Sequence, residues 1–470
     1  MKQSAESSGA VQRLLFEDEF DLPVATEFRP QPQTCNAGLL LLGALDRRSG
    51  LTEGFTAALR EYRDGECIHD LGDLSRQRIY GILGGYADAN DAAQLRDEPL
   101  FRLLLDRDLG EEEGLASQPT LCRFERGIGM GSLMRAGKYL ADYVLKRQRK
   151  RLRRVPRITL DLDPTEDPAH GQQVFSFFNT HYGQRVFLPV LAFATFHDRH
   201  NVEEPERFLL AALLRRGDVG ATVGSDGLIR RLVALTRKRF PEAKIRVRLD
   251  GGYATPEIFA LLEKLRVEYV VNMGKNEVLK RLAEPHMIKA RIQATLSGET
   301  ERVFGECRYS AGKWKGKKRR VVIKAEVTID PAAPEKGLKD NPRFVVTNLR
   351  SAPEQVYAGV YCLRGSAEKH IEELKNSCYL DRTSCMDFLA NQFRVLLATA
   401  AYVLLQEARV KARSTKAGAW RMENWRNRLL KVAGLVQRST RRWLVQIYKG
   451  IPDVDLFNRL ARLFGAHETG

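Results

Sequence analysis

Apolar residues recur every three to four positions over much of the first 150 residues, a spacing typical of amphipathic helices. Ser117 and Pro119 predict the start of one such helix, with Ser117 as N-cap and Pro119 in the first turn. Residues 1–35 are polar and contain proline, so we expect them to be loosely ordered. The pattern therefore predicts a helical region over 36–150 behind a loosely ordered start.

The pattern changes after residue 150. Short stretches rich in β-branched and aromatic residues predict strands at Arg157–Asp163, Val174–Asn179, Val186–Phe196, Lys244–Asp250 and Glu268–Met273. Longer periodic stretches predict helices at Glu203–Arg215, Gly227–Phe240 and Thr255–Leu265. Three consecutive strands followed by alternating helices and strands predict an α/β fold over 151–273, with a mixed sheet covered by helices.

The remaining residues divide into three segments. Residues 274–356 break the alternation, and strands predicted at Arg319–Ile329 and Arg343–Asn348 indicate a β-rich insertion. Residues 357–409 are helical in pattern and apolar nearly all round toward their end, which predicts a buried helix. Residues 410–470 are predicted to form a basic helical segment.

The composition is that of a globular protein of several domains. The chain has 470 residues, of which 43% are hydrophobic and 29% charged. Its longest apolar runs fall short of the ~18 residues that a membrane span needs, so no membrane partner is expected. The seven cysteines are scattered without a CxxC pair, which favours a reducing cytoplasm over a disulfide framework.

The net charge of +17 is unevenly distributed. Residues 1–145 carry 16 basic and 24 acidic side chains, whereas residues 146–470 carry 60 and 35. The excess is concentrated in three basic stretches, at Lys146–Arg157, Lys313–Arg320 and Arg409–Lys449. A solvated face explains one such stretch, but three of them interleaved with aromatic residues favour contact with nucleic acid.

Three aspartates are candidates for chemistry. Asp161 and Asp163 lie two apart on one predicted strand and so project to the same face. Asp250 ends another strand, before a Gly-Gly turn. Carboxylates at strand ends beside a basic surface suit Mg²⁺, which prefers hard oxygen ligands. The alternative is that each aspartate caps a turn.

A fourth acid belongs to a helical stripe formed by Tyr361, Arg364, Glu368 and Lys375. One face would then hold a metal with the glutamate while the two cations bind phosphates. The alternative is a solvated stripe of ion pairs. Gly365-Ser366 also allows the regular helix to begin late, which would leave the tyrosine and arginine in the preceding turn.

Taken together, these motifs resemble the DDE transposases of bacterial insertion sequences that carry a YREK signature, and within them insertion-sequence family 1380. The similar stretches are Gly85-Tyr86 through Asn90-Asp91, Leu95-Arg96-Asp97, Leu115-Ala-Ser-Gln-Pro-Thr-Leu121, Arg123-Phe124-Glu125, Asp161-Leu-Asp-Pro-Thr165, His170-Gly171, Asn341-Pro-Arg-Phe-Val-Val-Thr-Asn348 and Asn391-Gln392-x-Arg394.

The resemblance implies an RNase H-like catalytic core interrupted by the β-rich insertion, with N-terminal helices that help to recognise transposon ends. It implies catalytic and metal-binding roles for Asp163, Asp250 and Glu368, with Asp161 as the alternative first acid. Mg²⁺ is the implied metal, with Mn²⁺ as a substitute. One departure is Gly251, where the family pattern has serine, and this leaves room for an inactive copy.

The function expected from this resemblance is cleavage of insertion-sequence ends and joining of the 3′-OH to target DNA by two-metal phosphoryl transfer. The expected partners are double-stranded terminal repeats and target DNA, with a homodimer in the synaptic complex. DNA-binding roles are expected for Tyr361, Arg364, Lys375, Trp314, Lys317, Lys318 and Arg319. Trp314 would stack on an unpaired end base, unless it is an ordinary exposed aromatic on a hairpin.

Two other readings of the sequence stay open. One is a metal-dependent nuclease that cuts without strand transfer, and the other is a catalytically inactive DNA-binding relative. The expected location for all three is the bacterial cytoplasm, at the nucleoid when DNA is bound.

Overall fold

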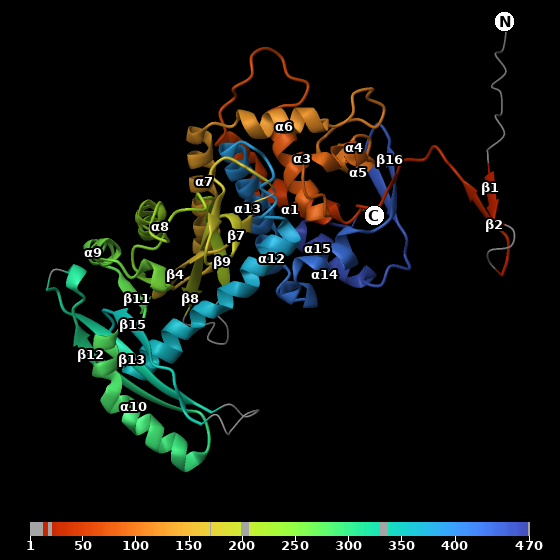
Figure 1. Cartoon of the computed structure of the whole chain (residues 1–470). Coiled ribbons are helices and arrows are strands. Elements are labelled where there is room, and N and C mark those ends of the chain that lie inside the picture. Colours follow the sequence, from red (N-terminus) through yellow and green to blue (C-terminus); the bar gives the residue numbers. More distant parts are fainter. Residues whose placement is uncertain are drawn as a thin grey trace, which may run out of the picture.

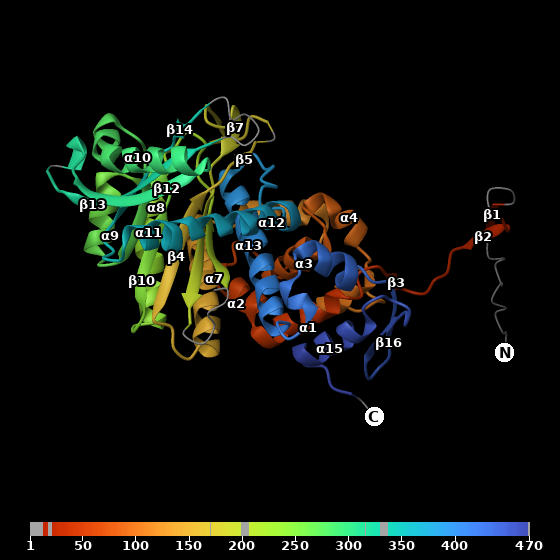
Figure 2. The ribbon, with the colours of Figure 1, turned by 90° about the horizontal axis from the view of Figure 1, so that it is seen from below.

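The computed structural model describes residues 13–16, 21–169, 171–198, 206–314, 316–329 and 337–468. Figure 1 shows an elongated molecule with a helical body at one end and a sheet that extends to the other. The hairpin of β1 (Arg13–Phe16) and β2 (Val24–Glu27) stands apart from this body in both views (Figures 1 and 2). Of residues 1–35, which were expected to be loosely ordered, 1–12 and 17–20 lie outside the described residues.

The helical body begins with the region predicted to be helical. Its helices are α1 (Leu39–Ser49), α2 (Leu51–Ala57), α3 (Leu71–Gly84), α4 (Ala92–Leu95), α5 (Pro99–Leu104), α6 (Gln118–Gly127) and α7 (Met130–Arg151). Helix α6 starts where predicted, with Ser117 at its N-cap and Pro119 in its first turn. These helices surround α13 (Phe388–Lys411), which packs against α3, α6 and α7.

Helix α13 is the buried helix expected near the end of 357–409. It is the one helix in the described part of the chain that is long and apolar enough to cross a membrane. However, 83% of its apolar window is buried inside the molecule, as in the core helix of a soluble protein.

The central sheet is mixed, as predicted. Its path is β12-β13-β15-β11-β10-β4-β8-β9, with β14 (Lys339–Asp340) paired to β13. Strands β4 (Arg157–Pro164), β10 (Lys244–Leu249) and β11 (Glu268–Met273) are parallel, and β8 (Val190–His197) and β9 (Arg207–Leu213) continue the sheet antiparallel. Helices α8 (Ser225–Arg239) and α9 (Pro256–Lys264) connect β9 to β10 and β10 to β11.

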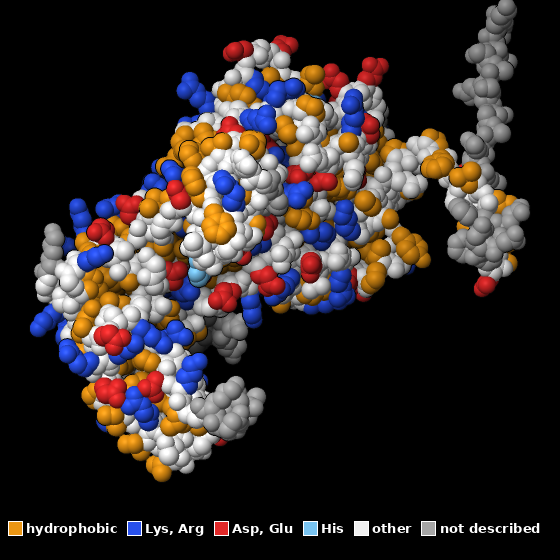
Figure 3. All heavy atoms as spheres, in the orientation of Figure 1, with side chains coloured by type: hydrophobic (Ala, Val, Ile, Leu, Met, Phe, Trp, Pro, Cys, Tyr) orange, Lys and Arg blue, Asp and Glu red, His pale blue; other side chains and the backbone are white. Residues whose placement is uncertain are grey.

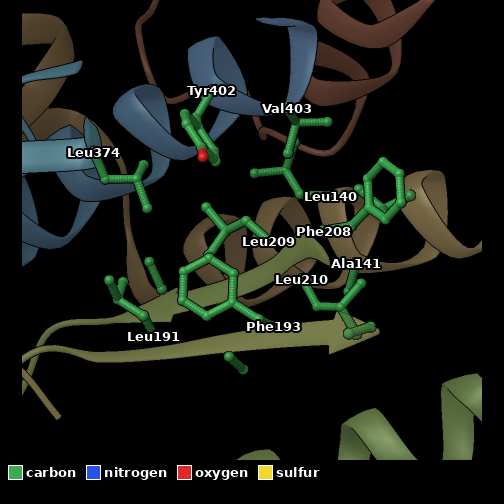
Figure 4. Packing of buried hydrophobic residues seen from close by; sticks show 14 of the residues in the cluster. Leu140, Ala141, Leu191, Phe193, Phe208, Leu209, Leu210, Leu374, Tyr402 and Val403 are labelled. Carbon is green, nitrogen blue, oxygen red and sulfur yellow. The ribbon is translucent and has the colours of Figure 1, made fainter. Parts of the chain in front are cut away.

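The helix predicted at Glu203–Arg215 is wrong where the structure describes it, because Arg207–Leu213 is strand β9. This run is apolar on both faces, and such a run does not distinguish a buried strand from a buried helix. Figure 4 shows the reason for the double burial: Leu209 lies under Tyr402 and Val403 of α13, whereas Leu210 lies beside Ala141 of α7.

Two predicted strands are also redistributed. The strand predicted at Val174–Asn179 is reduced to β6 (Phe177–Asn179). The strand predicted at Val186–Phe196 is divided by Leu188-Pro189 into β7 (Gln184–Phe187) and β8. Strands β5 (Asp167–Pro168), β7 and β6 form a small separate sheet beside the ends of the main strands.

Residues 274–356 extend the main sheet. Helix α10 (Glu277–Ser297) leads to β12 (Glu301–Tyr309), β13 (Arg319–Thr328) and β15 (Arg343–Thr347). The last two strands were predicted. Strand β15 pairs with β11, so the added strands are continuous with the sheet, and α10 packs on β12 and β13.

A helical segment of residues 353–378, here called the crossing segment, then passes over the sheet (Figure 2). It comprises α11 (Pro353–Val356), a π turn (Tyr357–Tyr361), a 3₁₀ turn (Cys362–Ala367) and α12 (Glu368–Cys378). The regular helix α12 therefore begins late, which confirms the alternative suggested by Gly365-Ser366.

The C-terminal segment was predicted to be helical, and this is wrong for its middle part. After α14 (Met422–Trp425), β16 (Gly434–Arg438) and β17 (Trp443–Ile447) form a hairpin, followed by α15 (Val454–Phe464). Half-buried and exposed residues alternate along β17, but a period of two over only five residues is too short to stand out from the surrounding helical pattern. Strand β3 (Gln33–Thr34) pairs with β16.

Candidate active site

Two of the predicted acids come together at the carboxyl ends of neighbouring parallel strands. Residue Arg248 of β10 is in register with Asp161 of β4, so Asp250 and Asp163 occupy adjacent positions two residues further along. Asp250 also caps the turn that follows, since its Oδ1 accepts a hydrogen bond from the Gly252 amide (2.9 Å). Turn capping and an active-site role, given above as alternatives for each aspartate, are therefore compatible at Asp250.

Arg364 lies over these two acids. Its Nη1 is 2.8 Å from Asp163 Oδ2, and its charge also acts on Asp250. Burial raises the pKa of Asp163 to about 6, an effect that Arg364 opposes and the neighbouring Asp250 and Asp161 reinforce. Burial also raises the pKa of Asp250, again opposed by Arg364. The pair therefore holds negative charge that one guanidinium only partly compensates.

Asp161 has a different environment. It is fully buried, and both its oxygens accept from Arg248: Nε donates to Oδ1 (2.6 Å) and Nη2 to Oδ2 (2.7 Å). A second guanidinium, from Arg207, lies 3.4 Å away. Asp161 thus anchors two arginines, which leaves Asp163 as the acid at the strand end.

The two arginines anchored by Asp161 hold the crossing segment in place. Arg248 Nη1 donates to the carbonyl of Val360 (2.7 Å). Arg207 donates to the carbonyls of Leu363 (2.9 Å) and Arg364 (3.3 Å). These arginines were not among the sequence candidates, although Arg246 and Arg248 alternate along the strand predicted at Lys244–Asp250, and cations on one face of a strand are a usable signal of charge pairing.

Glu368 begins α12 one turn after Arg364 and is exposed. Within the described residues, no three His, Cys, Asp or Glu side chains gather in a way that could hold a metal ion. The structure therefore brings Asp163 and Asp250 together, under Arg364, and leaves Glu368 on the adjoining turn.

The other members of the predicted stripe are spread along the crossing segment. Tyr361 is half-buried, and burial raises its pKa while Arg364 lowers it. Lys375 lies further along α12, where its charge acts on Asp167. Asp167 itself is buried and accepts from Thr383 Oγ1 at both oxygens (3.0 and 2.8 Å), and burial raises its pKa to about 8.

Trp314 was expected either to stack on a DNA base or to be an exposed aromatic on a hairpin. The structure corrects both expectations, because the Trp314 side chain is buried. Its side chain is only 5% exposed and packs edge-on against Phe259 and Tyr309. The Arg319 guanidinium lies 5.0 Å from the centroids of the Phe259 and Trp314 rings. The physical reason is that α9 covers this indole, which belongs to the core between α9 and the added strands.

The basic residues beside Trp314 surround a cavity of about 600 Å³. Arg319 and Lys317 pair with Glu263 (2.9 and 2.6 Å), whereas Lys318 is exposed. The cations that line this cavity are Arg308, Lys317, Lys318, Arg319, Arg320 and Arg350. Figure 3 shows Lys and Arg side chains spread over the lobe that carries α9, α10 and the added strands.

Comparison with known proteins adds one finding to this geometry. No curated protein matches the chain. A family model described as transposase DDE domain group 1 matches residues 16–467. Two acids at adjacent strand ends, in a chain that this match spans almost completely, place the protein in the DDE transposase domain family, group 1.

Proposed function

We propose that this protein is a DNA transposase that cleaves the ends of an insertion sequence and joins the freed 3′-OH to target DNA. The observation that carries the proposal is the pair Asp163 and Asp250, half-buried side by side beneath Arg364 in a chain of the DDE family. The finer placement in insertion-sequence family 1380, with Tyr361, Arg364, Glu368 and Lys375 as its signature, is part of the proposal.

The strand order supports an RNase H-like core. Within the main sheet, β4, β8 and β9 are neighbours that pair antiparallel. Strands β10 and β11 come next along the chain, run parallel to β4, and are each reached through a helix. The acids lie on the two strands at the centre of this arrangement, β4 and directly after β10.

The residues present fit a divalent cation. Two half-buried carboxylates have more negative charge than the single guanidinium of Arg364 compensates, and hard oxygen donors suit Mg²⁺ or Mn²⁺. Asp163, Asp250 and Glu368 would hold the metal. When bound, it would activate the attacking oxygen and stabilise the leaving oxygen of a phosphodiester.

The protein's own groups then position the DNA. Glu368 lies four residues after Arg364 on the crossing segment, so a displacement of this turn would be needed to replace the guanidinium with the carboxylate at the two aspartates. Released from Asp163, Arg364 would bind a phosphate oxygen. Lys317, Lys318 and Arg319 would hold the backbone of double-stranded DNA at the added strands, and two copies would pair two ends.

The proposal is tested with the full-length chain, Mg²⁺ and DNA carrying the ends of its own element. Asp250→Asn removes the charge but keeps an oxygen for the Gly252 cap, so the fold is retained. Asp218→Asn is the matched control, since Asp218 is paired only to Arg216 at the surface. Nicking and joining by the wild type and the control, lost in Asp250→Asn, are expected.

The same assay separates the alternatives. Nicking without joining would indicate a nuclease. A band shift with intact DNA would indicate an inactive DNA-binding relative, for which Gly251 in place of the family's serine is the observation in favour.

A further inference from the structure

A second basic cavity lies on the other side of the crossing segment from Asp163 and Asp250. It has a volume of about 610 Å³ and is enclosed by β8, β9, the 3₁₀ turn and α12 of the crossing segment, α13 and residues 413–421. We call it the rear cavity. The cations that line it are Arg207, Arg248, Lys369, Arg409, Arg413 and Arg421.

The inner cations of the rear cavity are fixed in place. Arg207 and Arg248 are bound to Asp161 and to backbone carbonyls of the crossing segment. Arg409 is bound to Glu373, with Nη1 donating to Oε2 at 2.9 Å. Guanidinium groups held in this way lose little side-chain entropy when they bind an anion.

Few carboxylates oppose these cations. Only Glu206 and Glu373 line the rear cavity among the described residues, and each is already paired, to Arg151 and Arg409 respectively. Asp161 pairs with Arg207 and Arg248, and Glu372 pairs with Arg421 at the mouth (3.4 Å). The excess positive charge of the cavity therefore comes mainly from Lys369 and Arg413, for which the described residues provide no ion pair. His197 in its wall is consistent with this: burial, together with the charges of Arg246, Arg157 and Arg248, lowers its pKa to about 4.

Three polar atoms in the wall lack hydrogen-bond partners among the described residues: the donors Thr195 Oγ1 and Arg409 Nε, and the acceptor Glu206 Oε2, which is ion-paired to Arg151. Thr195 is 3% exposed, and its Oγ1 has no hydrogen-bond partner among the described residues. Arg409 Nε is likewise buried without a partner in that part of the chain. Buried hydroxyl and guanidinium groups are normally satisfied, so two unsatisfied donors beside excess positive charge indicate a missing anionic acceptor.

We propose that the rear cavity binds a phosphate group, with Thr195 and Arg409 donating to it from inside and Lys369, Arg413 and Arg421 at the mouth. The phosphate belongs either to a DNA backbone or to a free nucleotide. The DNA form rests on the proposed function, whereas binding of a free phosphate does not.

A phosphate bound there would contact the same turn that bears Arg364 and Glu368. Leu363, Ser366 and Lys369 line the rear cavity from that turn, while Arg364 reaches the acids on its other side. Occupation of the cavity would therefore bear directly on the position of the turn that carries Arg364 and Glu368.

Binding is measured by isothermal calorimetry on the full-length protein without divalent metal. The probes are inorganic phosphate, deoxyadenosine 5′-monophosphate and a 20-base-pair duplex of arbitrary sequence. The test variant is Arg413→Gln/Arg421→Gln, at the exposed mouth. The matched control is Arg230→Gln/Arg281→Gln, which removes the same charge from exposed positions that line neither basic cavity.

We expect the test variant to bind at least one phosphate-bearing probe roughly tenfold more weakly than the control does. Binding of the nucleotide identifies a free nucleotide as the source, and binding of the duplex alone identifies a DNA backbone. Thr195→Val, which keeps the shape of the side chain, should weaken the same probe. Equal affinities in the wild type, the test variant and the control, or no binding of any probe, would overturn the proposal.

This outcome is independent of the proposed transposition. Phosphate binding that depends on Arg413 and Arg421, in a protein that leaves DNA ends uncut, would support the rear cavity while rejecting the enzyme. DNA cutting that depends on Asp250, with unchanged phosphate binding in Arg413→Gln/Arg421→Gln, would support the enzyme and reject the rear cavity as a phosphate site.

Discussion

The guanidinium of Arg364 lies 2.8 Å from the carboxylate of Asp163 and also acts on Asp250, so a protein cation occupies the side of the acid pair that a metal would approach. Arg364 therefore competes with a divalent ion for the same charge. It also opposes the pKa increase that burial causes in both acids.

Substitution of Arg364 by Gln should strengthen metal binding in the absence of DNA. Removal of one competing charge close to a carboxylate is worth about 1.4 kcal/mol, or about tenfold in affinity, in a partly buried site. Calorimetric titration with Mn²⁺ measures this change. DNA cleavage should fall in the same variant, because the phosphate contact is lost. Unchanged or weaker Mn²⁺ binding would show that Arg364 does not occupy the metal position.

Asp161 should stabilise the fold more than it serves chemistry. Asp161→Asn leaves Arg248 and Arg207 buried without their full counter-charge, which typically costs about 3–5 kcal/mol of the free energy of unfolding. Urea denaturation measures this loss. The double variant Asp161→Leu/Arg248→Met should recover part of it, because the charges of that pair are removed together while Arg207 still lacks its counter-charge. The double variant should still cleave DNA poorly, since Val360 loses its anchor.

Trp314 should also act through stability. Trp314→Ala removes a buried indole from between Phe259 and Tyr309, and such truncations cost about 3–5 kcal/mol. Trp314→Phe should retain most of the stability and bind DNA ends as the wild type does. Loss of end binding in a stably folded Trp314→Phe protein would instead show that the indole reaches the DNA after a rearrangement.

Asp167 predicts how stability depends on pH. Its pKa is about 8 in the folded protein, well above the value of about 3.9 in an unfolded chain. The folded state therefore holds a proton that the unfolded state has lost between these values. Stability from this group is present below about pH 4 and is lost as the pH rises through about 8, by at most about 1.4 kcal/mol per pH unit.

Asp167→Asn removes this titration and keeps an oxygen for Thr383. Comparison of its unfolding free energy with that of the wild type at pH 5, 7 and 9 gives the measurement. As the pH rises from 5 to 7 to 9, the free energy of unfolding of the variant should increase relative to that of the wild type. Parallel profiles for the two proteins would show that Asp167 is ionised throughout.

The sequence predicts the strands of the two acids well, because β4 and β10 are short, β-branched and followed by turn residues. It does not predict β9, whose apolar residues are buried on both faces by α7 and α13. Nor does it show that Asp161 is occupied by arginines, since Arg207 lies 46 positions away along the chain. Contacts of this kind depend on packing between distant segments, which local periodicity does not encode.

The stripe from Tyr361 to Lys375 is instructive in the same way. Its helical spacing is correct in outline, yet the π and 3₁₀ turns before Glu368 change how its members are directed. The prediction that Trp314 is exposed failed for a different reason. Basic residues next to an aromatic residue in the sequence give no information on whether a helix from elsewhere in the chain covers its ring.

The pairing of β3 with β16 joins residues 33–34 to residues 434–435. During synthesis, the N-terminal helices therefore emerge long before the strand and the helix α15 that complete them. A ribosome that stops early releases a chain whose first domain is unfinished, and such a product is expected to be degraded rather than to occupy DNA. The N-terminal helices thus depend for part of their packing on elements more than 400 positions further along the chain.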